Sequence, residues 1–138
     1  MAEATTITVD ALTRGVRTTG PFEEVVARVR EALAAQGFGV LTEIDVQATL
    51  AAKTGAQIDP YLILGACRPQ LAEVAVNIEP RIGVLLPCNV VVRVDGEAVL
   101  VEALDPTLMA TVVGGDEIAA VADEAGTRID AALAAVAG

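Results

Sequence analysis

Two cysteines are the residues of this chain whose type and position best suit chemistry. Cys67 ends the apolar stretch YLILGAC, and Cys88 lies within a second apolar stretch, LLPCNVVV. Pro69 follows the first thiol and Pro87 precedes the second, so the backbone turns beside both. Thiolates are nucleophiles, and they are ligands for soft metal ions such as Cu(I). Because alanine or valine would fill a core without the oxidation risk of a thiol, this placement favours a shared functional site.

Packing is the alternative interpretation of both thiols, because free cysteine is among the most buried residue types. A third interpretation makes Cys67 the nucleophile of a thiol-dependent enzyme or redox partner. The chain has no His and no Ser, so neither a Ser-His-Asp nor a Cys-His pair can be formed. Activation of Cys67 would then depend on the helix that Pro69 starts and on the neighbouring Arg68. The sequence leaves open whether the protein is an enzyme.

Other residues complete the candidate site. Met109 could supply a third sulfur ligand to a metal, and Asn89 follows Cys88 directly. Lys53 is the only lysine among nine basic residues, although a solvated lysine in the last turn of a short helix explains it as well. Together with Arg68 and the two cysteines, these residues form the set predicted to bind a small ligand or a soft metal such as copper. No cofactor is expected to be required for folding.

Two acidic motifs receive no catalytic role. Glu43 and Asp45 flank Ile44 and would project from one face of a strand as a pair of acids. A helix cap at Asp45 and a solvated carboxylate at Glu43 account for the same residues. Asp105 with Pro106 indicates a turn and nothing more.

Composition excludes several classes of function. The 138 residues fit one domain, 1–138, and 54% of them are hydrophobic, so the chain can bury a core. The net charge of −10, with scattered basic residues, opposes binding to nucleic acid or to an anionic membrane surface. No apolar run approaches the ~20 residues of a membrane span, and MAEATTITVD lacks the features of a signal peptide. We therefore expect a cytoplasmic protein with reduced thiols.

Hydrophobic periodicity predicts the helices that would position the site. Apolar residues at helical spacing predict long helices over 21–36 and 116–136, the second capped by Asp116. Shorter helices are predicted over 46–55 and 69–79, and DPTLMATVVGG is predicted to be a loop with at most one helical turn. In the second short helix, one face is predicted to hold Leu71, Val74, Ala75 and Ile78.

The remaining apolar stretches predict a mostly antiparallel sheet, with the two long helices on one face of an α+β fold. Its strands are predicted over 6–20 (one strand or a bent pair), 38–44, 61–66, 88–94 and 97–103. The last two form a hairpin around Asp95-Gly96, which is a type I′ turn signal. Both faces of this hairpin are apolar, whereas a sheet with one solvated face should alternate. We therefore expect a homodimer in which the second subunit covers the face without helices.

Several motifs resemble those of the domain-of-unknown-function 302 family. They are GFGVLTEIDVQATLAAK, YLILGACRP, EPRIGVLLPCNVVV and LDPTLM, in the family's order, and they span about residues 22–109. The resemblance implies a TATA-binding-protein-like β-α-β(4)-α arrangement, here with a short extra helix, usually seen as a homodimer. It implies no established activity and no DNA binding. Arg68 stands where the family usually has Asn, so any polar contact of that side chain is in question.

The sequence thus supports a small homodimeric protein that binds a small ligand or a soft metal near Cys67 and Cys88. The rival hypotheses are the thiol-dependent enzyme or redox partner that uses Cys67, and an interaction protein whose thiols serve only as core.

Overall fold

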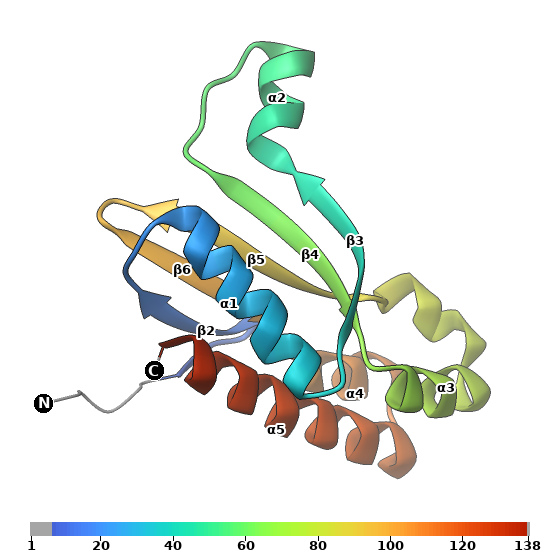
Figure 1. Cartoon of the computed structure of the whole chain (residues 1–138). Helices are drawn as coiled ribbons and strands as arrows, with labels where there is room; N and C mark the ends of the chain where they lie inside the picture. Colours follow the sequence, from blue (N-terminus) through green and yellow to red (C-terminus); the bar gives the residue numbers. More distant parts are fainter. Residues whose placement is uncertain (1–6, 138) are drawn as a thin grey trace, which may run out of the picture.

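Residues 7–137 are described by the computed structural model, which is an antiparallel sheet with helices packed against it (Figure 1). Thr6, the first residue of the predicted 6–20 segment, and the rest of the chain before it lie outside the described residues. The elements are β1 (Thr8–Val9), β2 (Thr13–Thr18), α1 (Phe22–Ala35), β3 (Gly39–Asp45), α2 (Val46–Thr54), β4 (Tyr61–Cys67), α3 (Pro69–Ile78), the 3-10 helix η1 (Pro80–Leu85), β5 (Cys88–Asp95), β6 (Ala98–Leu104), α4 (Thr107–Val113) and α5 (Asp116–Ala137).

The sheet has six strands in the order β1-β2-β6-β5-β4-β3, and all neighbours are antiparallel. Its helix-bearing face packs against α1 and α5, which lie side by side (Figure 1). Val25 and Val29 of α1 and Ile118 and Ile129 of α5 are all buried, as predicted. The predicted fold class, α+β with the two long helices on one face of the sheet, is confirmed.

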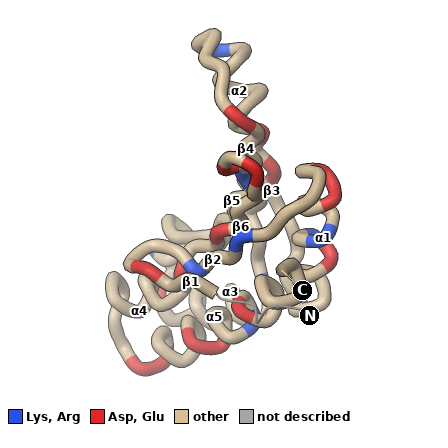
Figure 2. The backbone as a smooth tube through the Cα atoms, turned by 90° about the vertical axis from the view of Figure 1, so that its left-hand side faces the viewer, with Lys and Arg blue, Asp and Glu red and all other residues tan. Residues whose placement is uncertain are grey.

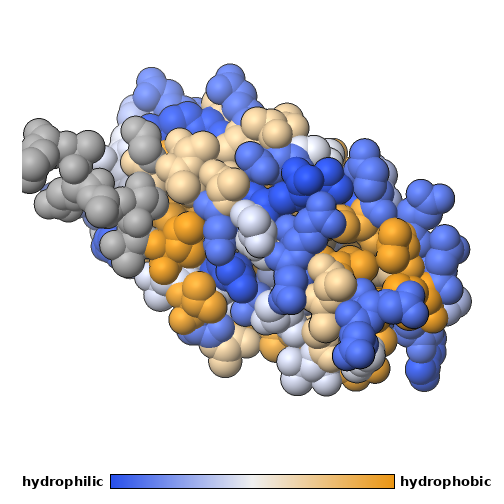
Figure 3. Space-filling view, turned by 90° about the horizontal axis from the view of Figure 1, so that it is seen from below, coloured by the Kyte–Doolittle hydropathy of each residue, from blue (hydrophilic) through white to orange (hydrophobic). Residues whose placement is uncertain are grey.

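A second apolar cluster forms where α3, η1 and α4 pack on the N-terminal half of α5. Its buried residues are Leu71, Ala75, Ile82, Met109, Ile118, Val121 and Ala125. From below, the outer side of the helical layer is mostly hydrophilic, with scattered hydrophobic patches (Figure 3). None of the helices within residues 7–137 is long and apolar enough to span a membrane.

The chain between β3 and β4 projects from the body of the protein as an arm (Figure 1). We define the arm as residues 39–61, which comprise β3, α2, the following loop and the first residue of β4. Asp45 caps α2 as predicted, because its Oδ1 accepts a hydrogen bond of 2.8 Å from the Ala48 N–H. Gly55 ends α2 with a φ of 74°, in the left-handed region that glycine tolerates. Residues next to this short helix therefore cap both of its ends.

Four local predictions need correction. The turn between β5 and β6 has Gly96 and Glu97 at its centre, because Asp95 pairs with Ala98. Gly96 has a φ of 62°, and no described residue other than glycine has a positive φ. A type I′ turn needs positive φ at both central residues, so the turn belongs to the type II′ class, which places glycine first.

The segment predicted as a loop contains α4, which spans Thr107–Val113. Burial of Met109 against α5 stabilises a helix that is too short to persist alone. Asp116 is the first helical residue of α5 and not its cap, since the carbonyl of Gly115 accepts the Ala119 N–H. In α3, Leu71 and Ala75 are buried as predicted, whereas the side chains of Val74 and Ile78 are exposed.

Candidate functional site

A small cavity lies where the ends of β4 and β5 meet α3, α4 and α5. Its volume is about 30 Å³, and it is lined by Phe38, Ala66, Cys67, Arg68, Leu71, Ala72, Ala75, Leu86, Cys88, Met109, Val121 and Ala125. Arg68 is the one charged residue of the lining, and the other lining residues are apolar or contain sulfur. Cys67, Cys88 and Met109 carry all the sulfur atoms of residues 7–137, and all three residues line this one cavity.

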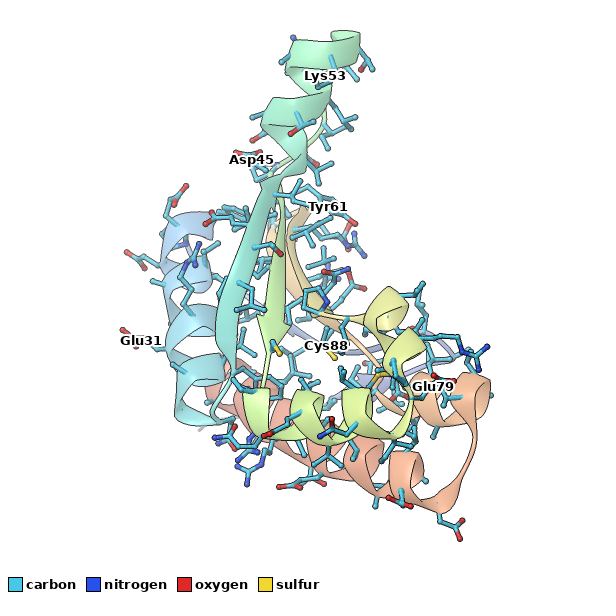
Figure 4. The ribbon with its side chains drawn as sticks, turned by 90° about the vertical axis from the view of Figure 1, so that its right-hand side faces the viewer. Glu31, Asp45, Lys53, Tyr61, Glu79 and Cys88 are labelled. Carbon is cyan, nitrogen blue, oxygen red and sulfur yellow. The ribbon has the colours of Figure 1, made fainter. Side chains whose placement is uncertain are left out.

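Strand register makes the two cysteines diagonal neighbours in the sheet. Ala66 pairs directly with Cys88 across β4 and β5, so Cys67 is the next residue along from that pair. Cys88 shares the helix-bearing face with Ala66, whereas Cys67 is the last residue of β4 and pairs with Gly39. Successive strand residues point to opposite faces, so register alone would aim the Cys67 side chain away from that of Cys88. Both residues nevertheless line the cavity, which lies at the end of these strands. Figure 4 shows Cys88 between the sheet and the helices of the lower half of the molecule.

Burial keeps both thiols protonated. Desolvation raises the pKa of Cys88 to about 11, and the nearby Cys67 adds to this rise because two thiolates would repel each other. Desolvation also raises the pKa of Cys67. A nucleophilic cysteine needs a lowered pKa, so this environment does not favour a thiol-dependent enzyme. Both cysteines are free thiols.

Arg68 supports the neighbouring helix end and does not lower the pKa of Cys67. Its Nε donates a hydrogen bond of 3.2 Å to the carbonyl of Gln36, at the C-terminal end of α1. Gly37 follows with a φ of 82°, and a Cβ atom there would lie 3.1 Å from the Arg68 Nε. The polar contact of this side chain is therefore with the backbone of α1.

The other residues of the predicted set lie elsewhere. Lys53 is exposed on α2, at the far end of the arm from Cys88 (Figure 4). Asn89 is exposed on β5, where it pairs with Gly65. Neither residue lines the cavity. The structure thus brings together Cys67, Arg68, Cys88 and Met109, and these four cavity residues form the candidate site.

A larger cleft of about 440 Å³ lies between α1 and the base of the arm. Several of its polar groups are already engaged: Arg30 NH2 contacts Glu43 Oε2 at 2.6 Å, and Asp45 caps α2. The amide of Gln47 donates to the carbonyl of Ile58 at 3.0 Å. The predicted acid pair is therefore an ion pair and a helix cap, and the cleft offers few free polar groups. Within residues 7–137, no group of three or more Cys, Asp and Glu side chains is placed to hold a metal ion.

Sequence reasoning missed the role of Gly65 in the LGAC motif. A Cβ atom at this position would lie 2.0 Å from the Thr42 Oγ1 and 2.8 Å from the Pro87 Cγ. Glycine therefore lets Thr42 and Pro87 lie close against β4 immediately before Cys88 begins β5. The only sequence signal for this role is a glycine inside a strand, which often marks a close approach of another part of the chain.

We predict that Gly65→Ala lowers the free energy of unfolding by about 1–3 kcal/mol, because the added methyl group overpacks this contact. Urea unfolding would measure the loss. The matched control is Gly83→Ala, since a Cβ atom at Gly83 meets nothing within 4 Å. Adding Thr42→Ala to Gly65→Ala should restore part of the loss. Equal stabilities of Gly65→Ala and the wild type would refute the packing role.

Comparisons with known proteins agree with this arrangement. The fold places the chain among small α+β proteins, and residues 14–136 match the family described as "Domain of unknown function DUF302". The chain belongs to this family, as its motifs indicated. It is also similar to the crystal structure of an uncharacterized conserved DUF302 protein from Bacillus stearothermophilus, with 27% identity and a TM-score of 0.83. That match covers 90% of this chain and 97% of the other. No curated protein matches the chain.

Proposed function

We propose that the protein is a small cytoplasmic homodimer that binds a soft metal ion of the Cu(I) class through Cys67, Cys88 and Met109. The observation that supports this proposal is that all three sulfur-containing residues of the described chain, Cys67, Cys88 and Met109, line one cavity. Thiolate and thioether ligands select Cu(I) over harder cations. We propose neither nucleic acid nor a membrane surface as a partner, because the chain carries a net charge of −10.

The size of the cavity favours an ion over an organic ligand. Ligand pockets usually enclose roughly 300–1,000 Å³, whereas this cavity has about 30 Å³. A cavity of that size accommodates one metal ion, and its wall contains the residues that would supply the sulfur ligands. Metal binding must displace the thiol protons, and the pKa of Cys88 is raised to about 11. Affinity for the metal should therefore increase with pH.

Titration of the reduced protein with Cu(I) against a competing chelator tests the proposal. We expect one ion per chain, no binding to Cys67→Ala or Cys88→Ala, and affinity reduced roughly 10-fold or more in Met109→Leu, which keeps the side-chain volume. Lys53→Ala is the control, because Lys53 lies outside the cavity. Circular dichroism would establish that each variant is folded. Unchanged metal binding in both cysteine variants would contradict the proposal.

The homodimer is supported by the sheet face that α1 and α5 leave free. We call it the open face and define it by Ile63, Val91 and Leu100, which alternate with the buried core residues of β4, β5 and β6. All three are apolar and only partly buried. Light scattering should give twice the chain mass of 14.1 kDa.

A further inference from the structure

We propose that the arm packs on the open face of a second copy of this chain, so that a two-fold dimer buries both arms. This inference rests on the homodimer proposed above, and it assigns the surface through which the two copies associate. Four properties of the molecule support it: the lack of burial in the arm, the apolar row on the open face, the distribution of charge and the projecting shape.

No residue of the arm is buried, although β3 and α2 within it are regular elements. From Gly39 to Tyr61, every residue is partly or fully exposed, and α2 has no buried residue at all. Isolated helices shorter than ~12–15 residues are marginal in water, and α2 has 9 residues. Its caps contribute about 1 kcal/mol each, whereas fixing the backbone costs roughly 1–2 kcal/mol per residue. The arm therefore needs an apolar surface to pack against.

The open face offers such a surface, and it is continuous with the arm. Ile44 pairs with Ile63, and Ile63 pairs with Val91, so these side chains form an apolar row across β3, β4 and β5. Ile44 is 49% exposed, and Leu41, at the irregularity in β3, is 65% exposed. A single copy leaves this row in contact with water.

The charge distribution permits a second copy as the occupant. A chain with a net charge of −10 repels its own copies wherever their acidic surfaces meet. On the open face, the charges cancel in pairs, because Arg93 contacts Glu102 at 2.6 Å and Arg17 contacts Asp95 at 3.0 Å. Residues 46–58 contain a single charged side chain, that of Lys53. Acidic residues lie along α1 and α5, in the lower part of the molecule and at the base of the arm, which contains Glu43, Asp45 and Asp59 (Figure 2).

A two-fold dimer covers both the arm and the open face of each copy. The arm extends beyond the ends of the neighbouring strands (Figure 1), so it cannot fold back over the open face of its own copy. In a two-fold dimer the same patches meet on both subunits, and each arm then covers the apolar row that its partner leaves free. The interface is closed, which prevents further association through these surfaces.

Hydrogen exchange at two protein concentrations tests the inference directly. At high concentration, we expect the amides of α2 to exchange at least about 10-fold more slowly than at a concentration where light scattering detects monomer, because only the dimer covers them. Amides of α5 should show no such dependence, since α5 packs within one copy. Equal exchange of α2 in monomer and dimer would overturn the inference.

Paired variants then locate the interface. Leu50→Glu on the arm and Val91→Glu on the open face should each raise the dimer dissociation constant at least about 30-fold, as a charge buried in an interface does. The matched control is Val112→Glu on α4, because Val112 is 70% exposed and belongs to neither surface. Thermal unfolding would verify that all three variants are folded.

The outcomes separate the inference from the homodimer itself. If the dimer persists in Leu50→Glu or Val91→Glu, the homodimer proposal stands and the inference about the arm is overturned. A monomer mass for the wild type at about 100 micromolar, which is well above the micromolar dissociation constants of weaker interfaces of standard size, would overturn both. Loss of the dimer in Val112→Glu alone would assign the interface to α4 and reject the arm.

Discussion

Replacing Arg14 with methionine is expected to lower the free energy of unfolding by about 3–5 kcal/mol, because the change leaves the buried carboxylate of Asp105 without its cation. Arg14 lies on the helix-bearing face of β2, where its Nε contacts Asp105 Oδ1 at 3.0 Å and its NH1 contacts Asp130 Oδ2 at 2.7 Å. Asp105 is 7% exposed and is the buried charged residue of the described core. Gly126 of α5 leaves room for the guanidinium, since a Cβ atom there would lie 3.3 Å from the Arg14 Cζ.

Arg17→Met is the matched control for this prediction. It removes a similar ion pair from the same strand, but Arg17 and Asp95 are 59% and 50% exposed. Exposed pairs contribute less than about 1 kcal/mol. A second variant, Arg14→Met with Asp105→Asn, should recover part of the loss, because a neutral amide still accepts the Thr107 N–H that now bonds to Asp105 at 3.1 Å. Urea unfolding of the variants would measure all these differences. Equal losses in Arg14→Met and Arg17→Met would contradict the prediction.

The pH dependence of the Arg14 variant follows from the pKa of Asp105. Burial alone would raise this pKa, but the hydrogen bonds from Arg14 and Thr107 outweigh burial and lower it. A carboxyl group whose pKa is lower in the folded state stabilises the fold at pH values above its unfolded-state pKa of about 4. This stabilisation is lost as the pH falls through the folded-state pKa. The difference in stability between wild type and Arg14→Met should therefore shrink as the pH falls below about 4.

Local patterns were sufficient to predict the elements that carry the fold. The apolar spacing in α1 and α5 predicted both helices and their buried faces, since each is long enough to show several turns of periodicity. The hairpin of β5 and β6 followed from two apolar runs around a glycine. The short helix α4 and the 3-10 helix η1 were not predicted, because packing of Met109 and Ile82 in the second cluster stabilises them and no local periodicity does.

The candidate site was predictable only in part. Sequence position placed Cys67 and Cys88 at strand ends, but the register that brings Ala66 opposite Cys88 depends on pairing between distant segments. The same limit applies to Asp105, which was interpreted as a simple turn signal. Its partner Arg14 is 91 positions away, so no local pattern reports the contact. Arg68 was assigned to the thiol because the two are adjacent in sequence, whereas its hydrogen bond is to Gln36, 32 positions away.

The burial of Cys88 predicts a loss of stability at alkaline pH. The pKa of this thiol is raised by burial, and further by Cys67, from 9.0 to about 11. In the unfolded chain the thiol ionises near its ordinary pKa. As the pH rises, this ionisation stabilises the unfolded state before it can stabilise the folded state. A raised pKa gives stability that is complete below the unfolded pKa and is lost as the pH rises toward the folded pKa. At ~1.4 kcal/mol for each pKa unit, the loss between pH 9 and 11 amounts to about 3 kcal/mol.

Cys88→Ala removes this ionisation and is expected to remove the corresponding loss, although its stability at neutral pH should be lower because a packed thiol is missing. Urea unfolding from pH 8 to 11 under reducing conditions, for both proteins, isolates the contribution of Cys88, since all other titrations are common to them. In Cys67→Ala the loss should persist but end at a slightly lower pH, because the charge of Cys67 no longer raises the pKa of Cys88. If the stabilities of wild type and Cys88→Ala fall in parallel with rising pH, Cys88 ionises as freely in the folded protein as in the unfolded one. The cavity would then be open to water, and the soft-metal site would lose the enclosed, apolar surroundings that its three sulfur ligands share.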